Sequence, residues 1–266
     1  MDTNLAPRVE LPSAPGPTRA PAVEIPQYTL GKIVSIWLIA AATMGALAWV
    51  VAPFVASRLH GSAPLPRALL VALTLGLIWQ SVLVAILVRR EQGSLRWSVV
   101  RDALWLGRPT SPRTGRVGGK VWWILVPLIL AFGAESVIPS LPHAAGHDFG
   151  LFLGTPAAER LFDGSWVWFG LVVALALFNT VLGEELLFRG LLLPRMNGAF
   201  GRGDWLANGV LFALYHLHMP WVIPTALLDA ALLAYPTKRY RSAWIGIAVH
   251  SAQSVVITAA VLAVVL

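Results

Sequence analysis

Long apolar stretches dominate the pattern of hydrophobic and polar positions. Residues 33–57 and 68–88 contain no charged side chain. Each stretch reaches the ~20 residues that an α-helix needs to cross about 30 Å of hydrocarbon. Both are therefore predicted to be transmembrane helices.

Five further apolar stretches each contain a polar residue or a proline. They are residues 121–141, 165–195, 205–219, 221–235 and 243–266. Together with the first two, they predict an all-α polytopic membrane bundle of seven transmembrane helices, with eight as the alternative count. Composition agrees, because hydrophobic residues make up 57% of the chain and charged residues 12%, against about a quarter charged in soluble domains.

The distribution of charge predicts the orientation of the bundle. Residues 89–120 hold eight Arg or Lys residues and two acidic ones, which accounts for most of the net charge of +7. Because basic loops stay on the cytoplasmic side, the N-terminus is expected there too. The pI of about 10.5 then indicates topology and contact with the lipid bilayer, not nucleic-acid binding.

Three regions follow along the chain. Residues 1–29 are rich in proline and lack the features of a signal peptide, so they are predicted to be a disordered cytoplasmic tail. Residues 30–164 hold the N-terminal helices. Their basic loop, 89–120, is predicted to contain an amphipathic helix in the membrane interface, with a solvated connector as the alternative. Residues 165–266 form the third region.

The absence of cysteine excludes thiolate chemistry.

Three charges interrupt the stretch 165–195 within six residues: Glu184, Glu185 and Arg189. Inserting one charge into a membrane costs about 2.5 to 3.5 kcal/mol, so this segment predicts a functional site. Glu185 and Arg189 are four residues apart and share a helix face, where they can form an ion pair. Glu184 is then the less compensated carboxylate and the candidate to deprotonate a water molecule.

Two histidines are expected at the depth of Glu184. At a rise of ~1.5 Å per residue, Glu184 lies about 16 Å from the cytoplasmic end of its helix, His216 about 18 Å and His250 about 13 Å. A shared depth on three helices predicts a shared site. The imidazoles are candidates to polarise a carbonyl, stabilise an oxyanion or bind a metal.

Four other polar residues in or near the spans receive a structural interpretation. His218 and Glu135 are interpreted as side chains near the outer interface. Asn179 is expected to bond between helices. For Asp229, a bond within the bundle is favoured over the lining of a pocket.

The order of motifs resembles a known family. Glu184-Glu185-x-x-x-Arg189, then Phe212-x-x-x-His216, then His250 resemble the three motifs of the CPBP (Abi) intramembrane endopeptidases. This family includes the enzyme that trims prenylated CAAX proteins and bacterial proteins linked to bacteriocin maturation. The resemblance covers residues 165–266, which would be the catalytic core.

The resemblance implies a role for each motif residue. Glu184 would activate the attacking water with His216 beside it, and His250 would help to stabilise the oxyanion. Glu185, Arg189 and Phe212 would support them. The third motif departs from the family's HxxxN, because the chain reads His250-Ser-Ala-Gln-Ser254. Ser254 is expected to replace the asparagine through its hydroxyl, with Gln253 as the alternative.

Several alternatives stay open at this point. Glu184, His216 and His250 form a legitimate zinc ligand set, and a mechanism without metal needs the same residues. The expected substrate is a membrane-associated peptide or protein in a bacterial cell membrane. A catalytically idle immunity or scaffold protein is the main alternative function, and a proton or cation transporter is the second. Asp204 in a Gly-x-Gly-Asp segment is interpreted as a helix cap, not as a protease carboxylate.

Overall fold

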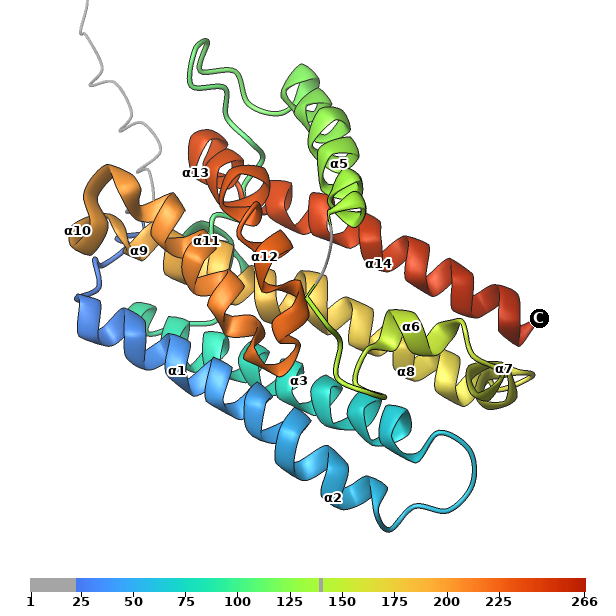
Figure 1. Ribbon diagram of the computed structural model, residues 1–266. Coiled ribbons are helices and arrows are strands. Elements are labelled where there is room, and N and C mark those ends of the chain that lie inside the picture. The colour runs from blue at the N-terminus through green and yellow to red at the C-terminus, as the bar shows by residue number, and fades with distance from the viewer. Residues whose placement is uncertain (1–22, 139–140) are drawn as a thin grey trace, which may run out of the picture.

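The described part of the protein is helical. The computed structural model describes residues 23–138 and 141–266, and Figure 1 shows how their helices are arranged. Apart from one isolated antiparallel bridge between Thr110 and Val117, every element in these residues is a helix. The predicted all-α class is therefore confirmed.

Four helical segments are long and apolar enough to cross a membrane. The first joins α1 (Leu30–Ala46), the π-helical η1 (Leu47–Val51) and α2 (Ala52–Ala56), and the second is α3 (Pro64–Gln92). The third joins α8 (Trp166–Leu177), η4 (Phe178–Gly183), η5 (Leu186–Leu192) and α9 (Leu193–Arg195), and the fourth is α14 (Ala243–Val265). The chain is thus an integral membrane protein, but a count of seven or eight spans is not confirmed.

The other expected spans are short or broken. The 3-10 helix η2 (Gly119–Ile124) leads into α5 (Leu125–Ala134), and the short 3-10 helix η3 (Glu135–Val137) follows. The 12 residues of α11 (Asp204–Tyr215) cover only about 18 Å. After it come η7 (His216–His218), η8 (Pro220–Val222), α12 (Ile223–Ala226), η9 (Ala230–Ala234) and α13 (Tyr235–Tyr240).

Proline explains much of this break. A proline lies in the first turn of η8, α12 and α13, where its missing N–H group and fixed φ prevent the preceding helix from continuing. Broken backbone at membrane depth is tolerated where it lines a cavity. Residues 204–240 therefore form a helical hairpin that turns back near Met219.

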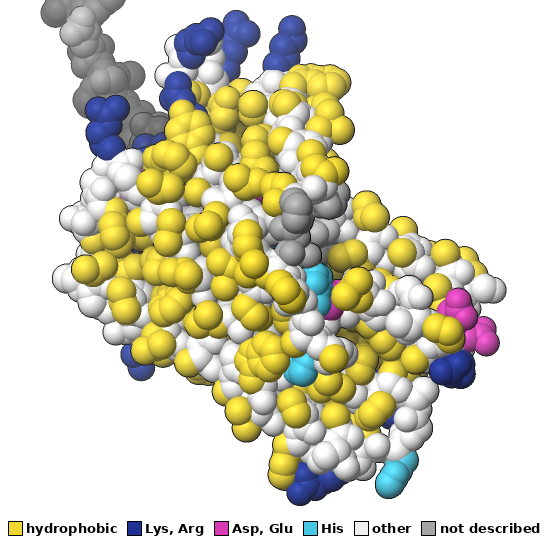
Figure 2. Space-filling model, viewed as in Figure 1, with side chains coloured by type: hydrophobic (Ala, Val, Ile, Leu, Met, Phe, Trp, Pro, Cys, Tyr) yellow, Lys and Arg dark blue, Asp and Glu magenta, His cyan; other side chains and the backbone are white. Residues whose placement is uncertain are grey.

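The remaining helices are short and lie at the two ends of the bundle. They are α4 (Trp97–Ala103), α6 (Phe149–Leu153), α7 (Pro156–Phe162), α10 (Asn197–Phe200) and η6 (Gly201–Gly203). In the expected interfacial segment, α4 exposes Trp97 and buries Ala103. Figure 2 shows hydrophobic side chains over the flank of the bundle, with Lys and Arg mainly at its ends.

The chain just before α1 is anchored to the end of α9. The Tyr28 amide donates to the Arg195 carbonyl (2.9 Å), and the Tyr28 hydroxyl donates to Glu91. Arg195 in turn forms an ion pair with Glu91 (2.8 Å). Burial and the adjacent Glu91 raise the pKa of the Tyr28 hydroxyl well above its usual range. The prediction of a disordered tail falls mainly on residues 1–22, outside the described residues, and it is wrong for the buried Tyr28.

Two glycines allow the close packing that surrounds the site. A Cβ on Gly183 would lie 3.1 Å from the Leu77 carbonyl, so η4 packs directly on α3. A Cβ on Gly209 would overlap the backbone of Ala230, so α11 packs directly on η9. These contacts place Glu184 and Asp229, which follow and precede the packed segments, on the same interior cavity.

Candidate active site

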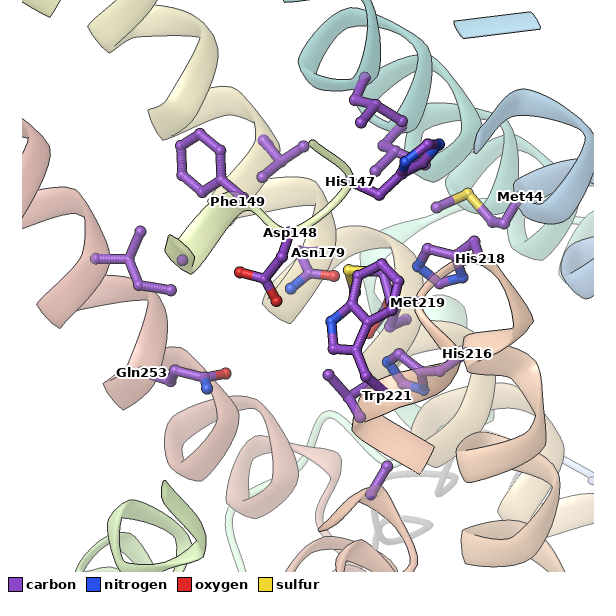
Figure 3. Close-up of a pocket in the computed structure, with 18 of the residues that line it drawn as sticks. Met44, His147, Asp148, Phe149, Asn179, His216, His218, Met219, Trp221 and Gln253 are labelled. Carbon is purple, nitrogen blue, oxygen red and sulfur yellow. The ribbon is translucent and has the colours of Figure 1, made fainter. Parts of the chain in front are cut away.

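A cavity of about 350 Å³ lies between the helices of the bundle. Its polar lining consists of Glu135, His147, Asp148, Asn179, Glu184, His216, His218, Thr225, Asp229, His250 and Gln253. Figure 3 shows Gln253 on one side of this space and His216 and His218 on the other. The cavity thus brings together Glu184, His216 and His250, which the sequence predicted at one depth.

Glu184 is 2% exposed and has hydrogen-bond donors on two sides. In the amide orientation that satisfies both groups, the Asn179 nitrogen donates to Glu184 Oε1 (2.9 Å) and Oε2 (3.2 Å). The Tyr215 hydroxyl also hydrogen-bonds to Glu184. Gln80 Nε2 donates to the Tyr215 hydroxyl oxygen (2.7 Å), which leaves the hydroxyl proton for Glu184. Three neutral side chains therefore fix the orientation of this carboxylate.

The local helix geometry explains why Asn179 reaches Glu184. In a regular α-helix, residues five apart point about 140° away from each other. Here η4 is a π-helix, and the Glu184 N–H group donates to the Asn179 carbonyl. This i to i+5 pairing widens the turn and brings the two side chains to the same face. Single π turns occur frequently at functional sites.

Glu185 points to a different set of partners. Its Oε1 atom lies 3.5 Å from Arg189 Nη1 and 3.1 Å from His250 Nδ1. Because a carboxylate only accepts, Nδ1 of His250 carries the proton, and Nε2 is the ring nitrogen opposite this contact. The pair of Glu185 and Arg189 is therefore present in the structure, and Glu185 also orients a histidine.

Gly246 on α14 makes room for this carboxylate. A Cβ at this position would overlap Glu185 Oε2 and would lie 3.2 Å from both Arg189 Cγ and Thr237 Oγ1. The close approach of α14 is what brings His250, four residues later, to Glu185.

Phe212 packs against Arg189, His216 and His250. The Arg189 guanidinium carbon lies 3.9 Å from the centre of its ring, a cation–π contact that adds to the ion pair with Glu185. The rings of His216 and His250 meet Phe212 edge-on, at centroid distances of 4.8 and 6.1 Å. Phe212 thus acts as a common spacer beneath the site.

His216 has a defined hydrogen-bond arrangement. Its Nδ1 atom lies 2.9 Å from the Phe212 carbonyl oxygen, which can only accept, so Nδ1 is protonated and Nε2 of the neutral ring is an acceptor. The turn that carries His216 is held by η1, because Trp49 Nε1 donates to the Leu217 carbonyl (2.9 Å).

Three polar residues were predicted outside this cavity, and the structure places them on it. His218 is 3% exposed and stacks on His216 at a centroid distance of 5.4 Å, so its assignment to the interface is wrong. Glu135 also lines the cavity. Asp229 is 4% exposed and lines it as well, which was the alternative interpretation of this residue. The chain turns inward at the break near Met219. The depth of His218 was counted along a straight helix and was therefore misleading.

The third motif differs most from the expectation. The cavity is lined by His250, Gln253 and Ile257, which form one stripe along α14, and Ser254 does not belong to this lining. At 100° per residue, Gln253 and Ile257 lie about 60° and 20° from His250 on one side, and Ser254 lies about 40° away on the other. The lining thus includes Gln253, the alternative residue, and does not include Ser254.

A short segment before α6 covers one side of the cavity. His147 stacks on Trp49 at a centroid distance of 4.5 Å, and His143 stacks on Trp221 at 5.4 Å. His143 Nδ1 also lies 2.7 Å from Asp148 Oδ2. These contacts connect the segment to η1 and to the broken hairpin. The sequence offered no signal for this, because the partners are far apart along the chain.

Glu184, His216 and His250 were the candidate zinc ligands. Within residues 23–138 and 141–266, no group of three or more His, Asp or Glu side chains is arranged to hold a metal ion. The ring nitrogens Nδ1 of His216 and His250 contact the Phe212 carbonyl and Glu185, so Nε2 is the nitrogen that each ring offers to a ligand.

Comparison with known proteins identifies the same region. Residues 165–256 match a family model described as Rce1-like, Type II CAAX prenyl endopeptidase Rce1-like. No curated protein and no solved structure gives a significant match. The matched residues include Glu184, Glu185, Arg189, Phe212, His216 and His250, the residues that carry the sequence resemblance. Over residues 165–256, the chain is thus similar to the CAAX protease family.

Proposed function

We propose that this protein is an intramembrane endopeptidase that hydrolyses a peptide bond with water activated by Glu184. One observation carries the proposal: three separate segments bring Glu184, His216 and His250 to one buried cavity. A buried carboxylate in a membrane is costly and points to function. The family match supports the reaction class.

In the proposed reaction, Glu184 accepts a proton from water, and the hydroxide adds to the carbonyl carbon of the scissile bond. Collapse of the tetrahedral intermediate breaks the C–N bond, and Glu184 returns the proton to the leaving amine. His216 Nε2, an acceptor, binds the second hydrogen of the attacking water. Tyr215 and Asn179 keep the carboxylate turned toward the cavity.

The oxyanion needs hydrogen-bond donors. We assign this role to His250 Nε2–H and to the Gln253 amide. The role requires His250 in its imidazolium form, with the Nδ1 proton held by Glu185. In this role Gln253 takes the place of Ser254, the residue at the motif's asparagine position. Gln253 lines the cavity and Ser254 does not. An amide also supplies two N–H donors, which a serine hydroxyl cannot match.

The proposed substrate is a membrane-associated peptide or protein. The cavity lies within an apolar bundle, and its lining mixes the polar groups with Phe132, Leu175 and Ile257. An extended peptide with apolar side chains suits this lining better than a charged one. Prenylated CAAX peptides, which the family description names, are one class to test.

The test uses the full chain in proteoliposomes with a library of membrane peptides that includes a prenylated CAAX peptide. Cleavage is followed by mass spectrometry for wild type, Glu184→Gln and His250→Ala, with Glu159→Gln as a matched control on α7. We expect cleavage by wild type and the control, and loss in the other two. If an active family member cuts the library and wild type does not, the idle alternative replaces this proposal.

A further inference from the structure

A second cavity lies at the basic end of the bundle, far from the groups described above. It has a volume of about 780 Å³ and is formed by the loop before η2, by η2 itself, by the start of α5 and by the last residue of α13. Its polar lining consists of Ser111, Thr114, Arg116 and Lys120. Its apolar side includes Trp123 and Ile124.

The two cations of this cavity are not neutralised within the described part of the chain. No ion pair there involves Arg116 or Lys120, and both side chains are exposed. Other basic residues at this end, such as Arg195 and Lys238, do have carboxylate partners. The charge of Arg116 and Lys120 is therefore free for a ligand.

Backbone hydrogen bonds hold the loop that presents these groups. The Ser111 amide donates to the Arg116 carbonyl (2.8 Å), and the Gly115 amide donates to the Ser111 carbonyl (2.8 Å). The Thr110 amide donates to the Tyr240 carbonyl (2.9 Å), which attaches the loop to α13. The hydroxyls and cations thus converge from a folded turn and not from a free segment.

The apolar side continues into the membrane. Trp123 is 72% exposed, and Val126 and Leu130 further along α5 are 50% and 69% exposed. In an integral membrane protein these side chains face lipid tails, and the cations at the start of the helix lie at the height of the headgroups. Tryptophan is enriched at this level of a bilayer. A ligand here would contact cations at one end and hydrocarbon at the other.

We propose that this cavity binds one anionic phospholipid, with its phosphate between Arg116 and Lys120 and its acyl chain along Trp123 and α5. Ser111 and Thr114 would bond to the headgroup oxygens. A free phosphate would satisfy the cations alone and would leave Trp123 without a partner. Basic pockets beside membrane helices are suited to this class of lipid.

The test measures lipid at Trp123 by fluorescence quenching. The full chain is placed in phosphatidylcholine nanodiscs that contain phosphatidylglycerol with brominated chains, or the same fraction of brominated phosphatidylcholine. The signal of Trp123 is the difference between wild type and Trp123→Phe. We expect stronger quenching of this signal by the anionic lipid.

Charge variants distinguish lipid binding in this cavity from the general attraction of anionic lipid to basic surfaces. Arg116→Gln with Lys120→Gln should weaken the preference at Trp123 roughly 25-fold, because each cation that contacts the bound headgroup contributes about a fivefold factor. Arg96→Gln with Arg113→Gln removes the same charge from exposed positions outside the cavity and should leave the preference nearly unchanged. Equal loss in both double variants would overturn the proposal.

Two further results bear on the source of the phosphate. Inorganic phosphate, compared with chloride at the same ionic strength, should not reduce quenching by the anionic lipid. If phosphate abolishes the preference, the cavity recognises the free anion and the lipid proposal is wrong. Melting temperatures of all variants, measured in phosphatidylcholine alone, check that a lost preference does not come from unfolding.

Discussion

Replacing Tyr215 by phenylalanine tests whether Glu184 needs a fixed orientation. The change removes one oxygen atom and leaves the ring, which contacts Phe188, Phe212 and His216. It deletes the hydrogen bond to Glu184 and leaves Gln80 Nε2 without its acceptor. A hydrogen bond to a charged group is worth about 1.5 to 3 kcal/mol, and 1.4 kcal/mol corresponds to a factor of ten.

If the whole contribution holds Glu184 in its reactive orientation, kcat for a cleaved library peptide should fall about 10- to 150-fold. KM should change little, because Tyr215 does not belong to the cavity lining that meets the substrate. Tyr235→Phe is the matched control, since Tyr235 is 46% exposed and its ring packs on Trp205. The control should keep the kcat of wild type.

The double variant Gln80→Met with Tyr215→Phe separates positioning from damage to the fold. Removing both partners leaves no unpaired donor at Gln80, so the melting temperature should recover relative to Tyr215→Phe alone. The loss in kcat should remain, because Glu184 still lacks its donor. A Tyr215→Phe variant with the kcat of wild type, or a kcat that recovers together with stability, would refute the positioning role.

Three further results are expected. Gln253→Ala should lower kcat about 10²- to 10³-fold, because an oxyanion donor is lost. Ser254→Ala should keep a kcat close to that of wild type. A large loss of kcat in Ser254→Ala and a small one in Gln253→Ala would restore the serine interpretation. Gly246→Ala should lower stability by about 1 to 3 kcal/mol, because its Cβ would overlap Glu185. Gly45→Ala is the control, because a Cβ at this position meets nothing within 4 Å. It should not lower the stability measured by thermal unfolding. Dialysis against a chelator should leave cleavage unchanged, and recovery of lost activity by zinc alone would contradict the mechanism without metal.

The sequence predicted those parts of the site that depend on regular helix geometry. The contact between Glu185 and Arg189 follows from their spacing of four residues, and counting residues brought Glu184, His216 and His250 to one depth. Both arguments use only the rise and turn of an α-helix. The ion pair forms in the structure although η5, which joins its two residues, is a π-helix, and the three residues line one cavity.

The missed residues depend on departures from that geometry or on contacts between distant segments. Asn179 reaches Glu184 only because η4 is a π-helix. Tyr215 meets Gln80 across 135 positions of the chain, through one hydrogen bond between α11 and α3. The choice between Gln253 and Ser254 depends on how far α14 is rotated about its axis. Helical spacing alone does not fix that rotation.

The same features that weakened the count of spans also account for the cavity. Pro220, Pro224 and Pro236 break the stretch after α11 into short helices, and this break turns His216, His218 and Asp229 inward. A regular helix through this stretch would point His216 about 140 to 160° away from the other two side chains and would place Asp229 about 16 Å from His218. An apolar segment that prolines and polar residues interrupt is thus a poor predictor of topology. In this protein such a segment lines the cavity that contains the buried carboxylate of Glu184.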